Sequence, residues 1–267
     1  MSAYLVVFRI RFINTLQYRA AALAGMATQF AWGFMLILAY LAFYRSNPTA
    51  FPMKFSQMVS YIWMQQAFLT LYSAWVYADD LTDSIESGSI AYEMVRPINL
   101  YNRWFCQITA TRLAKAVLRC LPVLIVAFVV PEPFRMSLPS NPVVLLMYLT
   151  STVFSLGVVA AYTMLIYITV FYTLSLRGIR TFVGALSDFL GGAIIPLPFF
   201  PGPLQAVLGL LPFAAMQNAP LRIYSGNLAG NDALVAMALQ VFWLIVLLLA
   251  GRLAMGRALK KVVVQGG

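Results

Sequence analysis

The sequence of 267 residues contains no histidine, two cysteines and only eight acidic residues. Without histidine, neither Ser-His nor metal-His catalysis is available to the chain. The two cysteines, Cys106 and Cys120, are expected to form neither a disulfide nor a metal site. The phosphate loop G-x-x-x-x-G-K-[ST] is also missing, so the chain does not itself bind ATP in the P-loop manner. We therefore predict that it is not an enzyme and holds no catalytic residue, metal or cofactor of its own.

Long apolar runs dominate what the sequence does contain. Hydrophobic residues make up 62% of the chain, against about 45–50% in soluble domains. A helix of about 20 apolar residues crosses a hydrocarbon core of roughly 30 Å. Six stretches reach or approach that length, namely 20–44, 56–78, 108–130, 143–172, 181–200 and 232–251. The predicted fold is an all-α polytopic membrane protein with six transmembrane helices, forming one transmembrane domain over 1–267.

The basic residues are distributed unevenly between the connections of these stretches. With the N-terminus in the cytoplasm, fourteen of the eighteen Lys and Arg residues lie inside, and four lie outside: Arg45, Lys54, Arg135 and Arg222. Basic residues favour the cytoplasmic side, so both termini are predicted to be cytoplasmic. The net charge of +10 is then explained by attraction to anionic lipid headgroups, and no nucleic-acid partner is expected.

The segment 3–19 has an uneven distribution of polar and apolar residues. On a helix, Arg11, Asn14, Thr15 and Tyr18 share one face, and Leu5, Phe12, Ile13 and Leu16 occupy another. This pattern indicates an amphipathic helix lying along the inner membrane surface. A basic segment that serves only to fix the topology fits the pattern equally well.

Five of the eight acidic residues fall within the segment 79–97. Four of them follow helical spacing and would form one acidic face of a helix: Asp79, Asp80, Asp83 and Glu86. Acidic residues contribute little to membrane orientation, so we expect this face to dock a soluble partner. The alternative is a solvated loop whose acids offset neighbouring arginines.

The end of the same segment carries two signals that stop helices. Gly88 suits the left-handed position that closes a helix. Pro97, directly after Arg96, would end a second helix that follows Gly88. The segment is therefore predicted to form a short acidic helix, a turn and a second short helix.

The segment 191–220 is interrupted repeatedly by proline, at Pro196, Pro198, Pro201 and Pro203. The apolar piece that follows, 204–213, is about 15 Å long as a helix, which is half of what a crossing requires. We predict a re-entrant element that dips into the outer leaflet and borders a transport path. A lid packed against neighbouring spans is the alternative.

Two ionisable residues, Arg119 and Asp188, are expected at similar depth inside the membrane. Charges at such depth are costly and normally face a partner, so an ion pair between them is one hypothesis. In the alternative, Arg119 extends to the inner headgroups and Asp188 is exposed to water at a fifth span that begins later.

Taken together, these features resemble the permease subunit of a type-2 ABC exporter, in a bacterial branch with a separate ATPase subunit. The one local motif that carries the resemblance runs from Gly88 to Pro97, and the architecture covers essentially the whole chain. The resemblance implies a half-transporter in the bacterial plasma membrane. Two ATPase subunits would bind ATP and magnesium beneath it, and a second permease, identical or a sister chain, would complete the path through the lipid.

By position, the resemblance makes 79–97 the element that couples to the ATPase. The residues so implicated are Asp79, Asp80, Asp83, Glu86, Gly88 and Arg96. Two other classes of function remain open on the sequence. An ion channel would also have six spans and a re-entrant piece, but the filter sequence TVGYG is absent. A gradient-driven carrier could use Asp188, but no inverted repeat is visible.

Overall fold

The computed structural model describes residues 3–17, 19–173 and 177–260. The regular structure of this part of the chain is entirely helical, with no strand, so the all-α prediction is confirmed. The predicted place of Tyr18 lies outside the described residues. In chain order the elements are α1 (Ala3–Leu16), α2 (Arg19–Ser46), η1 (Pro48–Ala50), α3 (Phe55–Ala67), α4 (Leu69–Tyr72), α5 (Asp79–Glu86), α6 (Ile90–Met94), α7 (Leu100–Val129), α8 (Pro142–Thr173), α9 (Arg177–Leu190), η2 (Leu197–Phe199), α10 (Gly202–Leu210), α11 (Pro212–Met216), α12 (Asn218–Tyr224) and α13 (Gly230–Leu259).

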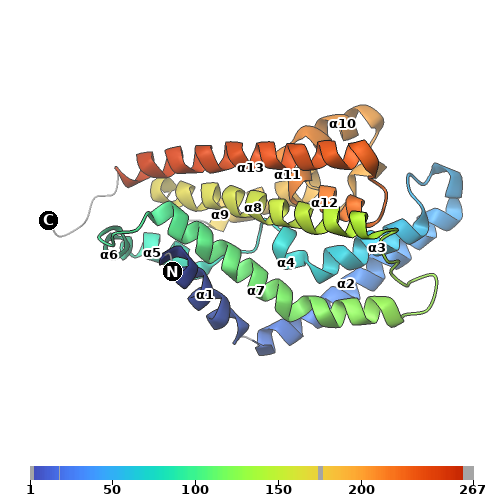
Figure 1. The fold of residues 1–267 in the computed structure, drawn as a ribbon, viewed down its shortest axis with the longest axis horizontal. Helices are drawn as coiled ribbons and strands as arrows, with labels where there is room; N and C mark the ends of the chain where they lie inside the picture. The colour runs from blue at the N-terminus through green and yellow to red at the C-terminus, as the bar shows by residue number, and fades with distance from the viewer. Residues whose placement is uncertain (1–2, 18, 174–176, 261–267) are drawn as a thin grey trace.

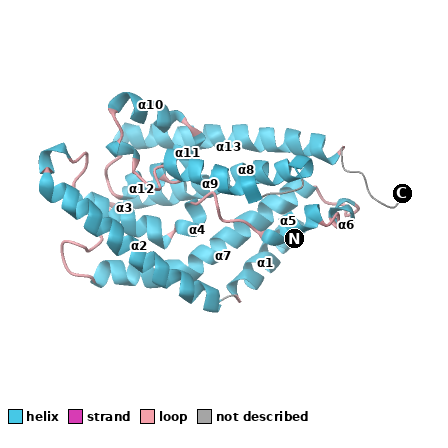
Figure 2. Ribbon diagram, turned by 180° about the vertical axis from the view of Figure 1, so that it is seen from behind, coloured by secondary structure: helices cyan, strands magenta, loops and turns pink. Residues whose placement is uncertain are grey.

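The long helices give the molecule its elongated shape. In Figure 1, α7, α8 and α13 extend along the long axis, and α5, α6, the start of α1 and the end of α13 lie at one end. The connections around η1 and between α7 and α8 lie at the opposite end, and α10 lies toward that end as well. Figure 2 shows the same division from behind. The acidic segment 79–97 and the proline-rich segment 191–220 are thus separated along the molecule.

Three helices are long and apolar enough to cross a membrane: Ala24–Ser46, Pro142–Thr173 and Gly230–Leu259. They correspond to the first, fourth and sixth predicted stretches. Helix α7, with 30 residues, is about 45 Å long and covers the third stretch. It differs from the other three because it carries four basic residues, Arg103, Arg112, Lys115 and Arg119.

The second and fifth predicted stretches are not continuous helices. In the second, α3 ends at Ala67, α4 adds four residues, and residues 73–78 are not helical. We call residues 73–78 the strap. In the fifth, α9 has 14 residues, about 21 Å, and ends at Leu190, ten residues before the predicted end. Each of these stretches therefore has carbonyl groups without helical partners, which must be satisfied in another way.

Arg112 of α7 satisfies the carbonyls at the end of α4 and in the strap. Its guanidinium is buried, at 1% exposure. Nη1 donates to the carbonyl oxygens of Thr70 at 3.2 Å and Ser73 at 2.7 Å, and Nη2 donates to that of Val76 at 2.8 Å and to Thr163 Oγ1 at 3.0 Å. Carbonyls at a helix C-terminus carry partial negative charge, so they also stabilise the buried cation. Arg112 is one of the fourteen basic residues that the sequence assigns to the cytoplasmic side, and its charge pattern alone does not predict these contacts.

Tyr167 of α8 holds the other end of the strap. Its hydroxyl accepts a hydrogen bond from the backbone N–H of Ala78 at 2.6 Å and donates to the carbonyl of the same residue at 3.2 Å. Tyr167 is itself fully buried. The strap is therefore fixed by α7 at its start and by α8 at its end, immediately before α5 begins.

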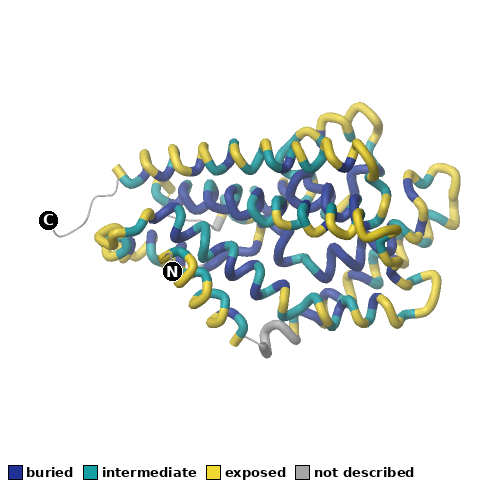
Figure 3. Tube along the Cα trace, in the orientation of Figure 1, coloured by how far each residue is buried: buried dark blue, intermediate teal, exposed yellow. Residues whose placement is uncertain are grey.

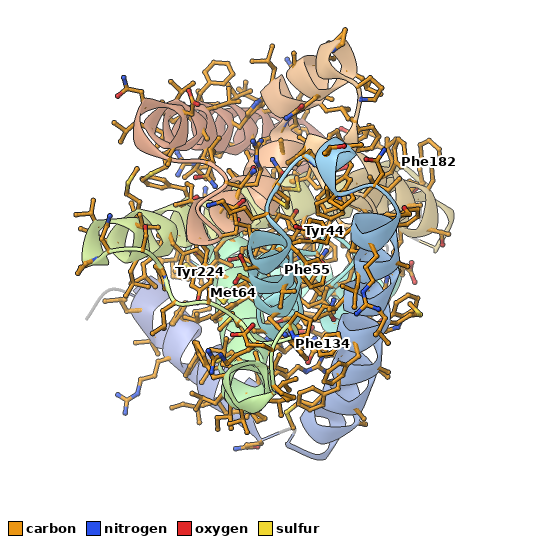
Figure 4. All side chains as sticks on the ribbon, turned by 90° about the vertical axis from the view of Figure 1, so that its right-hand side faces the viewer. Tyr44, Phe55, Met64, Phe134, Phe182 and Tyr224 are labelled. Atoms are coloured by element: carbon orange, nitrogen blue, oxygen red, sulfur yellow. The ribbon has the colours of Figure 1, made fainter. Side chains whose placement is uncertain are left out.

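The short helix α3 forms the centre of the molecule. It packs against α2, α7 and α12. Most of its residues are buried, and they are dark blue in Figure 3 at the place that Figure 1 labels α3. Figure 4 looks along the molecule from the end that carries η1. Phe55, Met64 and Tyr224 lie toward the middle in this view, whereas Phe182 of α9 lies at the rim.

Helix α3 also supports the turn that ends α9. Tyr61 donates from its hydroxyl to the carbonyl of Gly192 at 3.3 Å, and Gln65 donates to that of Ala193 at 3.0 Å. Gly192 has φ of +79°, a left-handed conformation that favours glycine. Helix α3 therefore connects the two interrupted stretches. It leads through α4 into the strap, and its side chains also hold the turn after α9.

We expect Arg112→Met to destabilise the protein strongly, because it leaves the carbonyls of Thr70, Ser73 and Val76 buried without donors. The loss should be about 3 kcal/mol, or roughly 6–12 °C in melting temperature. Thermal unfolding of the purified chain in detergent measures it. The control is Arg96→Met, which removes an exposed arginine. Equal melting temperatures for the two variants would contradict this role of Arg112.

Candidate coupling site

The segment 79–97 folds as two short helices joined by a tight turn. Helix α5 ends at Glu86, Gly88 has φ of +73°, and α6 follows from Ile90 to Met94. This is the order of elements predicted from Gly88 and Pro97. Leu81 and Ile85 of α5 and Ile90 of α6 are buried against α7 and α8. Burial of this apolar side fixes which residues of the two helices remain exposed.

The exposed side of α5 and α6 combines acidic and apolar residues. Asp83 and Glu86 are exposed on α5, as their spacing predicted. Tyr92 is 77% exposed and Val95 82% exposed, and Arg96 is exposed beside them. We call these five residues the coupling surface. Large exposed apolar side chains beside charges are typical of a protein interaction site.

Asp80 is also exposed on α5, and it forms an ion pair with α1. Its carboxylate accepts hydrogen bonds from both Nη atoms of Arg11, at 2.8 and 2.6 Å. Nε of Arg11 also donates to Thr111 Oγ1 of α7 at 2.9 Å. The guanidinium thus joins α1, α5 and α7. The side chain of Asp79 lies outside the described residues, so its predicted place on the acidic face stays a prediction.

Glu93 holds α6 against the start of α7. Its carboxylate accepts from Arg103 Nη2 at 3.1 Å and from Trp104 Nε1 at 2.8 Å, and the side chains of Arg103 and Glu93 are only 10% and 19% exposed. These contacts were not predicted from the sequence. Glu93 lies on α6, whereas Arg103 and Trp104 lie on α7, so the packing of the two helices brings them together.

Helix α1 packs along α7, and of its predicted polar face Thr15 is buried and Arg11 half-buried, whereas Asn14 is exposed. Arg11 makes the contacts described above, and Thr15 is buried. Leu5, Ile10 and Ile13 are exposed, at 57%, 55% and 46%. The helix therefore presents apolar side chains away from the protein, beside the end of the molecule that carries the coupling surface.

The proline-rich segment after α9 forms turns and short helices rather than one continuous helix. Pro196 and Pro198 are buried, whereas Pro201 and Pro203 are exposed at the start of α10. Helix α10 ends at Leu210, and α11 and α12 follow. The predicted apolar piece 204–213 is thus divided between two short helices. Its passage into the outer leaflet stays a prediction.

Arg119 and Asp188 lie in different surroundings. The guanidinium of Arg119 lies against Gly25 of α2, where an added Cβ would approach its Cζ to 2.6 Å. Asp188 lines a small cavity with Tyr72 and Gln217. Among the ion pairs of the described residues, none joins Arg119 to Asp188. The structure therefore does not form the ion pair that the sequence suggested.

The all-helical fold with long apolar helices defines a membrane protein. Comparison with protein families then identifies its class, because the model of the ABC-2 family transporter protein matches residues 29–266. The chain belongs to this family, and it is a permease component of an ABC transporter. No curated protein matches it in sequence. Family membership agrees with the missing phosphate loop.

We expect the ion pair between Arg11 and Asp80 to contribute about 1 kcal/mol of coupling, the upper part of the range for partly exposed pairs. A double-mutant cycle with Arg11→Ala and Asp80→Ala, read out by unfolding, measures it. Arg11→Ala with Asp83→Ala serves as the control, because Asp83 forms no ion pair in the described structure. Additive effects in both cycles would contradict the contact.

Proposed function

We propose that this chain is the membrane subunit of an ATP-driven exporter and is driven by a separate ATPase through the coupling surface. The observation that carries the proposal is the exposed combination of Asp83, Glu86 and Tyr92 on two short helices that are held rigidly to the long helices. A partner with a basic rim and an apolar pocket would complement it. Each of the two ATPase subunits would bind ATP and magnesium.

The proposal includes the arrangement in the membrane. The six stretches of the sequence would cross the bilayer of the bacterial plasma membrane, with both termini on the cytoplasmic side. The excess of basic residues on that side supports this orientation. The exposed apolar side chains of α1 would enter the inner leaflet and hold the coupling surface at a constant depth. Helices α10–α12 would form the re-entrant element in the outer leaflet, and a second permease would complete the path.

The contacts also suggest how movement at the coupling surface reaches the outer half of the protein. Helix α5 continues directly from the strap, which Arg112 and Tyr167 fix to α7 and α8. The strap continues into α4 and α3, and α3 holds the turn at Gly192 that precedes α10. Closure of the ATPase pair would shift α5 and α6, and this chain of contacts would carry the shift to the segment 196–203. Substrate would leave outward past this segment.

The experiment is co-purification of the chain with the ATPase encoded beside it, followed by ATP hydrolysis in lipid. The double variant Asp83→Asn/Glu86→Gln should weaken the binding of the ATPase by about tenfold, because it removes two charges from the interface. Hydrolysis in the complex should fall in parallel. Tyr92→Ala should have a similar effect through the apolar part of the surface.

The matched control is Glu132→Gln, which removes an exposed acid at the opposite end of the molecule. It should leave ATPase binding and hydrolysis unchanged. The proposal fails if the ATPase does not co-purify, or if the control weakens binding as much as the double variant does.

A further inference from the structure

A second polar site lies far from the coupling surface, between α10–α12 and the start of α13. It is a cavity of about 220 Å³. Leu210, Val235 and Leu239 contribute apolar walls, and Asn218, Arg222 and Asp232 contribute polar groups. None of the contacts described above uses these polar groups. The cavity thus combines hydrogen-bonding and charged groups with apolar walls, as small-molecule sites do.

Asn218 is the buried polar group of this cavity. Its side chain is 4% exposed, and its amide oxygen Oδ1 has no hydrogen-bond partner in the described structure. An unpaired acceptor at such burial is unfavourable, and native proteins seldom leave one without a function or a bound molecule. This oxygen has less than 1 Å² of accessible surface, so a ligand with an N–H or O–H donor would satisfy it once the side chain of Asn218 turns toward the cavity.

Arg222 and Asp232 add one charge of each sign. Nε of Arg222 donates to Asn227 Oδ1 at 2.7 Å, and no hydrogen bond from its two Nη groups is found in the described part of the chain. No ion pair of the described residues joins Arg222 to Asp232, although both line the same cavity. Opposite charges that share a cavity without pairing leave room for a ligand that pairs with each.

The apolar walls continue onto the surface of α13. Leu234 and Val235 are 56% and 67% exposed, and Phe242 and Ile245 further along the helix are also exposed. An acyl chain could therefore extend from the cavity along α13. A soluble zwitterion would leave this surface uncovered, so a lipid of the bilayer fits it better.

We propose that this cavity binds a zwitterionic phospholipid with a primary ammonium group, such as phosphatidylethanolamine. Its phosphate accepts hydrogen bonds from the free Nη groups of Arg222. Its ammonium group donates to the carboxylate of Asp232 and to Oδ1 of Asn218. One acyl chain follows α13. This inference concerns the permease alone and does not depend on the ATPase.

The test is native mass spectrometry of the full chain in detergent, with phosphatidylethanolamine, phosphatidylglycerol and phosphatidylcholine carrying the same acyl chains. The wild type should retain phosphatidylethanolamine about tenfold better than the other two, the value of one charge-assisted hydrogen bond. Arg222→Gln should lower the retention of all three lipids. Asp232→Asn should abolish the preference for phosphatidylethanolamine over phosphatidylglycerol. The control Arg45→Gln, at an exposed arginine that ends α2, should change nothing.

Asp232 is exposed, so its variant should fold and can decide the question even if Arg222→Gln does not. The proposal is overturned if the wild type does not discriminate between the lipids, if Asp232→Asn keeps the preference, or if Arg45→Gln lowers retention equally. A further arm uses glycerophosphoethanolamine, which has the headgroup without acyl chains. Binding of this compound as tight as that of the lipid would overturn the assignment to a bilayer lipid.

Discussion

The guanidinium of Arg112 replaces the backbone hydrogen bonds that the chain gives up between α4 and α5. Without these donors, the carbonyls of Thr70, Ser73 and Val76 would be buried and unpaired, which is unfavourable at any depth in a membrane. The strap can therefore leave the helix only where Arg112 can reach it. The position of α5 and of the coupling surface depends on this interaction, since α5 continues directly from the strap.

Periodic and compositional signals predicted the long elements well. Helices α2, α8 and α13 coincide with continuous apolar runs, and Gly88 marked the turn between α5 and α6. The break after Ala67 could not be predicted, because the residues from 67 to 78 include neither proline nor glycine. The strap that follows is held by a partner on α7, about forty residues away in sequence. A basic residue near a membrane boundary looks the same in sequence whether it is exposed to headgroups or buried.

The coupling surface was also predicted only in part, because local spacing does not show contacts between residues that are far apart in the sequence. The spacing of Asp83 and Glu86 placed them on one exposed side of a helix, and the structure has them there. Asp80 shares that spacing but pairs with Arg11, 69 residues earlier. Glu93 lies in the same segment but is bound by Arg103 and Trp104. Local periodicity thus placed Asp80, Asp83 and Glu86 on one helix, whereas the ion pairs of Asp80 and Glu93 depend on tertiary contacts.

Backbone hydrogen exchange of the strap tests most directly whether it is held rigidly between α7 and α8. The Ala78 amide, which donates to the hydroxyl of Tyr167 at 2.6 Å, is the most informative position. In the wild type it should exchange as slowly as the amides of α8. In Tyr167→Phe, which removes only the hydroxyl, its exchange should become faster while α8 stays protected. Equal exchange of Ala78 in both proteins would contradict the account.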